Sequence, residues 1–195
     1  MNKPLMAAAI AAAAAIAAPA HATNVALAAD GNWNAFDVDA SFGPTFSNDW
    51  IDNTIDIGRN TDGSRLNFTF TVPVGSIGKL TVVDGSLAGD TFTITNFGTT
   101  LGTTSSVAVD SGDFASSYDD ALADAAFSRG MFTLGAGSYS ISGSLLQSVF
   151  DPGVTDGALR LTVSSIPEPT NAALLLAGLA AVAAMTRRRQ SANQI

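Results

Sequence analysis

The stretch LNFTFTV, Leu66–Val72, alternates strictly between apolar and polar side chains. On an extended chain its apolar residues share one face and its asparagine and threonines share the other. The apolar positions are Leu66, Phe68, Phe70 and Val72, and the polar ones are Asn67, Thr69 and Thr71. A period of two predicts a β-strand with one buried face and one face in water.

The same alternation recurs in 91–95, 138–142 and 159–163, and KLTVV at 79–83 adds a strand that ends at Asp84-Gly85. Glycine-containing turns separate these runs at short intervals, which favours antiparallel neighbours over a parallel sheet. The pattern therefore predicts an all-β fold, an antiparallel β-sandwich of jelly-roll type. We assign this sandwich domain to residues 23–165.

One helix is expected within the sandwich, in SSYDDALADAAF. Ser117 is a good N-cap, Asp119 and Asp120 suit the first turn of a helix, and Gly130 would end it. Tyr118, Leu122 and Ala125 or Ala126 recur at helical spacing. Their shared face is expected to cover an edge or end of a sheet.

The first 22 residues are typical of a secretory signal peptide. Lys3 supplies the positive charge, 5–18 is an apolar, alanine-rich run, and Ala20-His21-Ala22 is a small-x-small cleavage site. Cleavage there leaves Thr23 as the mature N-terminus and predicts export.

The C-terminus carries a second targeting pattern. Pro167-Glu168-Pro169 is followed by 14 residues without a polar side chain, 172–185, and then by Arg187, Arg188 and Arg189. A helix of that length spans about 21 Å, short of a hydrocarbon core of about 30 Å. Arginines can extend such a span by snorkelling and keep their end in the cytoplasm. We predict a short transmembrane helix at 171–186 with a basic cluster at 187–189.

Residues 166–190 resemble the PEP-CTERM sorting signal of Gram-negative bacteria. The resemblance implies recognition by an exosortase, transient anchoring in the inner membrane, and release to the cell surface or the extracellular matrix. It makes exopolysaccharide or a biofilm a candidate partner. The same tail occurs on unrelated cargo domains, including proteins named ice-binding, so it implies an address and no activity. The segment 80–105 is similar to one common in secreted proteins with this tail.

Composition excludes several kinds of chemistry. The chain has no cysteine, and its one histidine, His21, lies in the signal peptide. The mature domain therefore lacks a Ser-His-Asp triad, a cysteine nucleophile and an ordinary zinc site. Residues 23–169 carry five basic and 17 acidic side chains, a net charge of −12, which disfavours nucleic acid. Paired aspartates leave a hydrolase formally open, although the one glutamate, Glu168, lies in the tail.

Aspartates are concentrated in FDVDASF and NDWIDNTIDIGRNTDG. Carboxylate and carbonyl oxygens are the ligands that calcium prefers, so these loops are a candidate calcium site. The candidate ligands are Asp37, Asp39, Asp49, Asp52 and Asp56. No EF-hand spacing occurs, and the alternative is that these residues form turns and a solvated acidic surface.

One set of aromatic residues and one set of threonines leave further functions open. Trp33, Trp50, Tyr118 and Tyr139 could form a carbohydrate platform, or they could belong to the core. The threonines at 91, 93 and 95 could belong to an ice-binding face, for which the chain lacks a fixed repeat, or they could simply favour a strand. We expect an exported, non-enzymatic surface or matrix protein. A calcium-stabilised glycan-binding module is the alternative, followed by a secreted hydrolase or an ice-binding protein.

Overall fold

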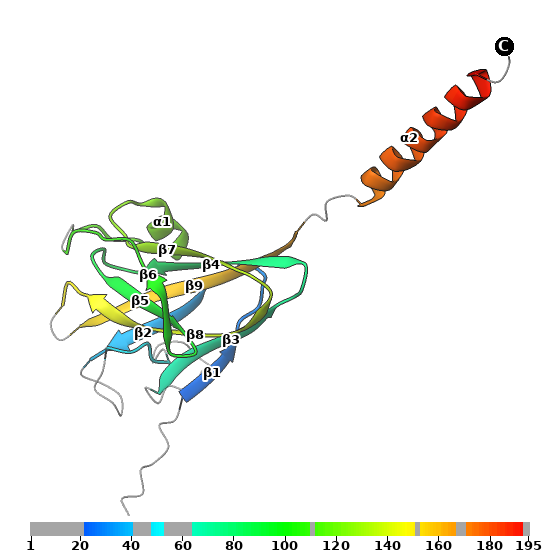
Figure 1. The fold of residues 1–195 in the computed structure, drawn as a ribbon. Coiled ribbons are helices and arrows are strands. Elements are labelled where there is room, and N and C mark those ends of the chain that lie inside the picture. Colours follow the sequence, from blue (N-terminus) through cyan, green and yellow to red (C-terminus); the bar gives the residue numbers. More distant parts are fainter. Residues whose placement is uncertain are drawn as a thin grey trace, which may run out of the picture.

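In a computed structural model, the structure describes residues 22–40, 48–52, 64–109, 112–150, 153–166 and 171–192. This part of the chain is mostly β-structure, arranged as two sheets that face each other (Figure 1). The signal peptide up to His21, the Pro167–Pro169 motif and Asp56 lie outside the described residues. Ala22 is the first residue of the first strand.

The larger sheet has five strands in the order β1-β3-β8-β5-β6. They are β1 (Ala22–Ala26), β3 (Arg65–Val72), β8 (Gly137–Gln147), β5 (Thr91–Asn96) and β6 (Thr99–Thr103). The smaller sheet has the order β2-β9-β4-β7. Its strands are β2 (Asn34–Asp39), β9 (Val154–Ser165), β4 (Ser76–Asp84) and β7 (Arg129–Leu134). Every pair is antiparallel except β1 with β3, so the predicted all-β, antiparallel-rich sandwich is confirmed apart from that pair.

The main core lies between the sheets and contains residues that the alternating pattern predicted to be buried. Leu66, Phe68 and Val72 of β3 are buried, and the half-buried Phe70 packs against the same cluster. An aromatic stack of Phe36 on Trp50, with ring centroids 3.8 Å apart, lies at its centre. All members of both hydrophobic clusters and the side chains packed on them lie within residues 25–163, so the sandwich contains its own core.

Residues 48–52 join the two sheets along one side. Trp50 donates its backbone N–H to Gly143 O on β8 and accepts from Leu66 N on β3, both at 2.9 Å. Ile51 exchanges two backbone hydrogen bonds with Asp37 on β2. This bridge places the Trp50 ring in the core, where no alternation in the sequence indicated it.

The helix α1 (Tyr118–Ala123) begins as predicted and ends earlier. Ser117 Oγ caps it by accepting from Asp120 N at 3.1 Å. The expected stop at Gly130 is wrong, because Gly130 lies within β7. The chain leaves the helix at Asp124, whose backbone is extended and whose carboxylate accepts from Ala126 N at 2.9 Å. The Arg129 guanidinium donates to the carbonyls of Leu122 and Asp124 and so satisfies the end of the helix.

A second hydrophobic cluster explains where α1 lies. Ala121 is buried with Val83 of β4 and Ala158 of β9. These two strand residues neighbour Val82 and Leu159 of the main core and therefore face the opposite side of the smaller sheet. The short helix thus covers the outer face of that sheet.

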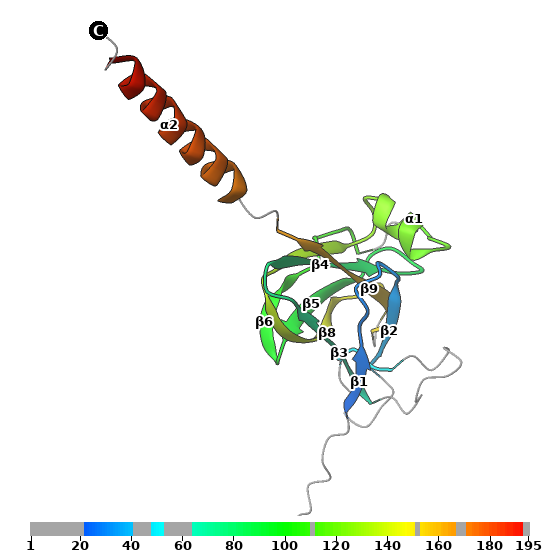
Figure 2. The same cartoon turned by 90° about the vertical axis from the view of Figure 1, so that its right-hand side faces the viewer.

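The second helix, α2 (Asn171–Ala192), is longer than the predicted 171–186 and includes the three arginines. In Figures 1 and 2 it stands away from the sandwich. Its apolar side chains at 174, 175, 179, 182 and 185 are between 59% and 70% exposed. Judged by length and hydropathy, none of the helices in the described residues qualifies as a membrane span. The sandwich ends at Ile166, whose N–H donates to Gly75 O at 2.7 Å.

Candidate functional site

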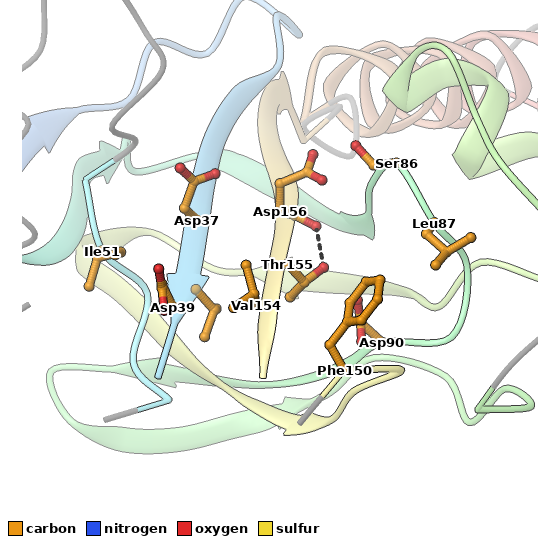
Figure 3. Close-up of a pocket in the computed structure, with 11 residues that line it drawn as sticks. Asp37, Asp39, Ile51, Ser86, Leu87, Asp90, Phe150, Val154, Thr155 and Asp156 are labelled. Carbon is orange, nitrogen blue, oxygen red and sulfur yellow. Dashed lines mark hydrogen bonds between the residues drawn. The ribbon is translucent and has the colours of Figure 1, made fainter. Parts of the chain in front are cut away.

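A pocket of about 540 Å³ opens between β2, the first residues of β9 and the loop that joins β4 to β5 (Figure 3). Its acidic lining residues are Asp37, Asp39, Asp90 and Asp156, and its hydroxyl groups come from Ser86 and Thr155. The apolar part of the wall is formed by Val38, Ile51, Leu87, Phe150 and Val154. No lysine or arginine of the described residues lines it. The pocket is therefore both apolar and acidic.

Strand register brings two of the aspartates together. Asp37 on β2 lies directly opposite Asp156 on β9, so their side chains emerge on the same face of the sheet (Figure 3). Asp156 Oδ2 accepts from the Tyr118 hydroxyl at 3.1 Å, and Asp156 O accepts from Gly85 N at 3.1 Å. A Cβ on Gly85 would lie 2.3 Å from Asp156 Oδ2. Glycine at 85 therefore allows the β4–β5 loop to approach β9 this closely.

Asp84 organises the β4–β5 loop from the inside. Its side chain is fully buried, and its Oδ2 accepts from Gly89 N at 3.2 Å and Asp90 N at 3.1 Å. Its Oδ1 has no hydrogen-bond partner among the described residues. Burial, followed by the negative charge of Asp90, raises the pKa of Asp84 from 3.8 to about 8. Asp84 is therefore mostly protonated at neutral pH.

Asp90 forms part of the pocket wall and is only 2% exposed. Its Oδ1 accepts from Val149 N at 3.0 Å, which fixes the carboxylate against the segment that follows β8. The Gln147 amide donates to Gly89 O at 2.8 Å and holds the same loop. Within the described part of the chain, Oδ2 of Asp90 receives no hydrogen bond and is not one of the fully enclosed polar atoms, so an accessible acceptor lies in the pocket wall.

The predicted calcium ligands do not all reach this pocket. Asp37 and Asp39 line it, whereas Asp49 forms an ion pair with Arg65 at 2.6 Å. Asp52 is fully buried and does not line it. Across the residues that the structure describes, no three acidic, imidazole or thiol groups are placed to hold a metal together. Since Asp56 is outside those residues, the calcium site stays a prediction.

The four aromatic residues do not form one carbohydrate platform. Trp50 is fully buried, which agrees with the alternative that it belongs to the core. Trp33 packs at 6.0 Å from Tyr118 beneath the Arg160 guanidinium, on the side of α1. Tyr139 belongs to the larger sheet, where it stacks on Phe70. The rings are thus divided between the core and two separate places.

The threonines do not form one continuous ladder either. Thr91 is buried, with 5% of its surface exposed. Strand β8 separates β5 from β3, so Thr69 and Thr71 are not adjacent to the threonines of β5. Threonines lie opposite one another on β5 and β6, Thr93 with Thr103 and Thr95 with Thr100. On the other side of β5, the partners of Thr93 and Thr95 on β8 are Ser144 and Ser142, so this threonine ladder does not continue across the described sheet.

Sequence reasoning missed Asp90, Asp156 and the apolar residues of the pocket. One feature of the sequence could have indicated Asp90 as a site residue, because DGSLAGD places an aspartate at each end of a loop that contains two glycines. Asp156 had none, since only its pairing with Asp37 brings it to the site.

Comparisons with known proteins give little further information. No family model and no curated protein matches the chain. Among solved structures, the sandwich is similar to the pre-peptidase C-terminal domain of a collagenase from Bacillus anthracis. The TM-score is 0.38 and the identity 10%, over 74% of this chain and 98% of that domain.

Proposed function

We propose that the chain is an exported, non-enzymatic protein of the cell surface or extracellular matrix, sorted by an exosortase. The observation that carries the proposal is the order of the tail: Pro167-Glu168-Pro169, an apolar helix, and Arg187–Arg189. In support, the described apolar side chains of α2 are exposed, and none of these belongs to a core cluster of the sandwich. A helix of this kind is suited to a transient place in the inner membrane before release.

For the sandwich we propose the jelly-roll topology. The supporting observation is the order β2-β9-β4-β7 in one sheet and β3-β8-β5-β6 in the other, with β1 added at the edge. In chain order, the eight strands after β1 alternate between the two sheets except where β5 and β6 form a hairpin. Two interlocked Greek keys produce this alternation.

The non-enzymatic assignment follows from the side chains that the domain contains. Residues 23–165 have no imidazole and no thiol, so an acyl-transfer nucleophile would lack its usual base. Asp84, whose pKa is raised to about 8, does not line the pocket. The pocket groups that remain are hydrogen-bond acceptors and apolar surface, which suit binding.

A calcium-stabilised glycan-binding module is the second candidate. The observation that favours it is the backbone bridge between Asp37 and Ile51, which brings the two aspartate-rich segments side by side. Carboxylates from both segments could then share an ion.

The sorting proposal is tested by mass spectrometry of the protein recovered from the cell surface of a host that has an exosortase. We expect the dominant form to lack peptides from Leu174–Met185. Replacing Pro167 and Pro169 by alanine should retain those peptides in the membrane fraction, because the residues before α2 could then continue the helix. The matched control replaces Pro73, which lies outside the tail, and should be processed normally. Recovery of uncleaved protein at the surface would refute the proposal.

A further inference from the structure

Asp90 Oδ2 gives the pocket an acceptor that the described residues do not use. Only 2% of Asp90 is exposed, its Oδ1 accepts from Val149 N, and its Oδ2 receives no hydrogen bond from the described residues without being one of the fully enclosed polar atoms. An acceptor oxygen open to the pocket can take a hydrogen bond from a bound cation or hydroxyl. Asp156, also in the wall, accepts one hydrogen bond at Oδ2 from Tyr118 and adds a second negative charge.

The described basic side chains of the sandwich do not supply that donor. Arg65 pairs with Asp49, Arg160 pairs with Asp119, and Arg129 binds the carbonyls at the end of α1. Lys79 is exposed on β4 and does not line the pocket. The positive partner that suits Asp90 is therefore a ligand.

The shape and the walls of the pocket favour an organic ammonium group over a metal ion. A volume of 540 Å³ falls within the range of small-molecule sites, about 300–1,000 Å³, and greatly exceeds that of one ion. Leu87, Phe150 and Val154 add apolar surface to the same wall as the carboxylates (Figure 3). The described acidic groups are also not placed to hold a metal together.

We propose that this pocket binds a protonated amino sugar, with the ammonium group at Asp90. The proposal deepens the glycan-binding candidate and does not depend on sorting. Beyond the ammonium, Ser86, Thr155 and Asp156 offer acceptors that suit the hydroxyl groups of a sugar ring. Phe150, with 53% of its surface exposed, gives a ring face against which sugar C–H groups can pack. A simple alkyl ammonium, such as a lysine side chain, would leave these acceptors unused.

Calorimetry with the Thr23–Ile166 chain tests the inference, because this part contains the complete core. The probes are the trisaccharide of glucosamine and that of N-acetylglucosamine, at about pH 6, below the usual pKa of such amines. We expect the glucosamine trisaccharide to bind at least about tenfold more tightly, since only it offers an ammonium for a charge-assisted hydrogen bond.

Single substitutions test whether the glucosamine trisaccharide binds at this pocket. Asp90→Asn should weaken binding of the glucosamine trisaccharide at least about tenfold, and Phe150→Ala at the exposed rim should weaken it without unfolding the chain. Asp30→Asn is the matched control, since it removes the same charge from an exposed position outside the pocket and should bind normally. The melting temperature of each variant verifies that it is folded.

Each contrary result overturns the inference in a different way. Equal binding of the two trisaccharides would assign the pocket to neutral glycans, and equal binding of a lysine-containing peptide would show that the sugar is not recognised. Competition by millimolar calcium would indicate a metal site. Absence of binding, in a protein that is still processed and recovered at the cell surface, would refute the amino-sugar site and leave the sorting proposal standing.

Discussion

Replacing Asp84 by asparagine should remove most of the dependence of stability on pH. Asparagine keeps an oxygen that can accept from Gly89 N and Asp90 N, as Asp84 Oδ2 does. It has no carboxyl group to ionise, so the penalty of a buried negative charge beside Asp90 disappears. Asp90, Asp113, Asp156 and Tyr118 are titratable groups near this loop, and they are unchanged in the variant.

The sign and size of the effect follow from the pKa of Asp84, which burial raises from its ordinary value of 3.8 to about 8 in the folded protein. Because the folded state holds the proton more tightly, this contribution is complete below about pH 4 and is lost as the pH rises towards about 8. The slope is at most about 1.4 kcal/mol per pH unit, or about 2.7 kcal/mol between about pH 5 and about pH 7. For a domain of this size, that corresponds to a change in melting temperature of about 5–10 °C.

Thermal and urea denaturation of the Thr23–Ile166 chain at several pH values measures this difference directly. Carboxylates common to both proteins contribute equally except Asp90, whose charge interacts with Asp84. The difference between the wild type and Asp84→Asn therefore measures Asp84 together with its coupling to Asp90. Asp90→Asn should lower the pKa of Asp84 by removing the neighbouring charge, and should therefore shorten the pH window at its alkaline end. Asp30→Asn should follow the wild type. Parallel stability curves for the wild type and Asp84→Asn would refute a raised pKa at Asp84.

Two further predictions concern packing and metal. Gly143→Ala should lower the melting temperature, because its Cβ would lie 2.5 Å from Trp50 Cε2, and the overpacking should cost about 1–3 kcal/mol. Gly135→Ala is the control, since nothing lies within 4 Å of a Cβ at that position. Equal losses of stability in the two variants would contradict this reasoning. If the segments around Asp37–Asp56 hold calcium, millimolar calcium should raise the melting temperature relative to chelator, since a ligand of the folded state alone stabilises it, and an identical melt would eliminate the calcium-stabilised candidate.

The strands were predictable because a local pattern encodes them. In 66–72 and 159–163 alternation matches the buried face of a sheet, and the packing of the sandwich agrees with it. The end of α1 was not predictable from a distant glycine, because the bond from Arg129 to Asp124 O and the bond from Ala126 N to the Asp124 carboxylate determine it. Trp50 enters the core because the backbone of Trp50 and Ile51 bonds to three different strands, which leaves no periodic signal in the segment itself.

The residues of the pocket were harder to predict from the sequence than the strands were, for a physical reason. Asp37 and Asp39 stood out because they are close together in the chain. Their partners in the pocket, Asp156 and Asp90, arrive through the pairing of β2 with β9 and through the loop that Asp84 holds. Long-range register and a buried side chain therefore determine the site, and neither is visible in local composition.

The two ends of β9 separate the pocket from the proposed sorting signal. Its first residues, Val154–Asp156, line the pocket, and its last residue, Ser165, leads through Ile166 towards the tail (Figure 1). Nine residues of extended chain at about 3.3 Å each place about 30 Å between Asp156 and Ser165. A domain held by its tail would present the pocket at its far end, and cleavage near Pro167-Glu168-Pro169 would leave every described residue of the pocket in place. Binding of an amino sugar should therefore be the same before and after the tail is removed, and a difference would show that the pocket and the tail are coupled.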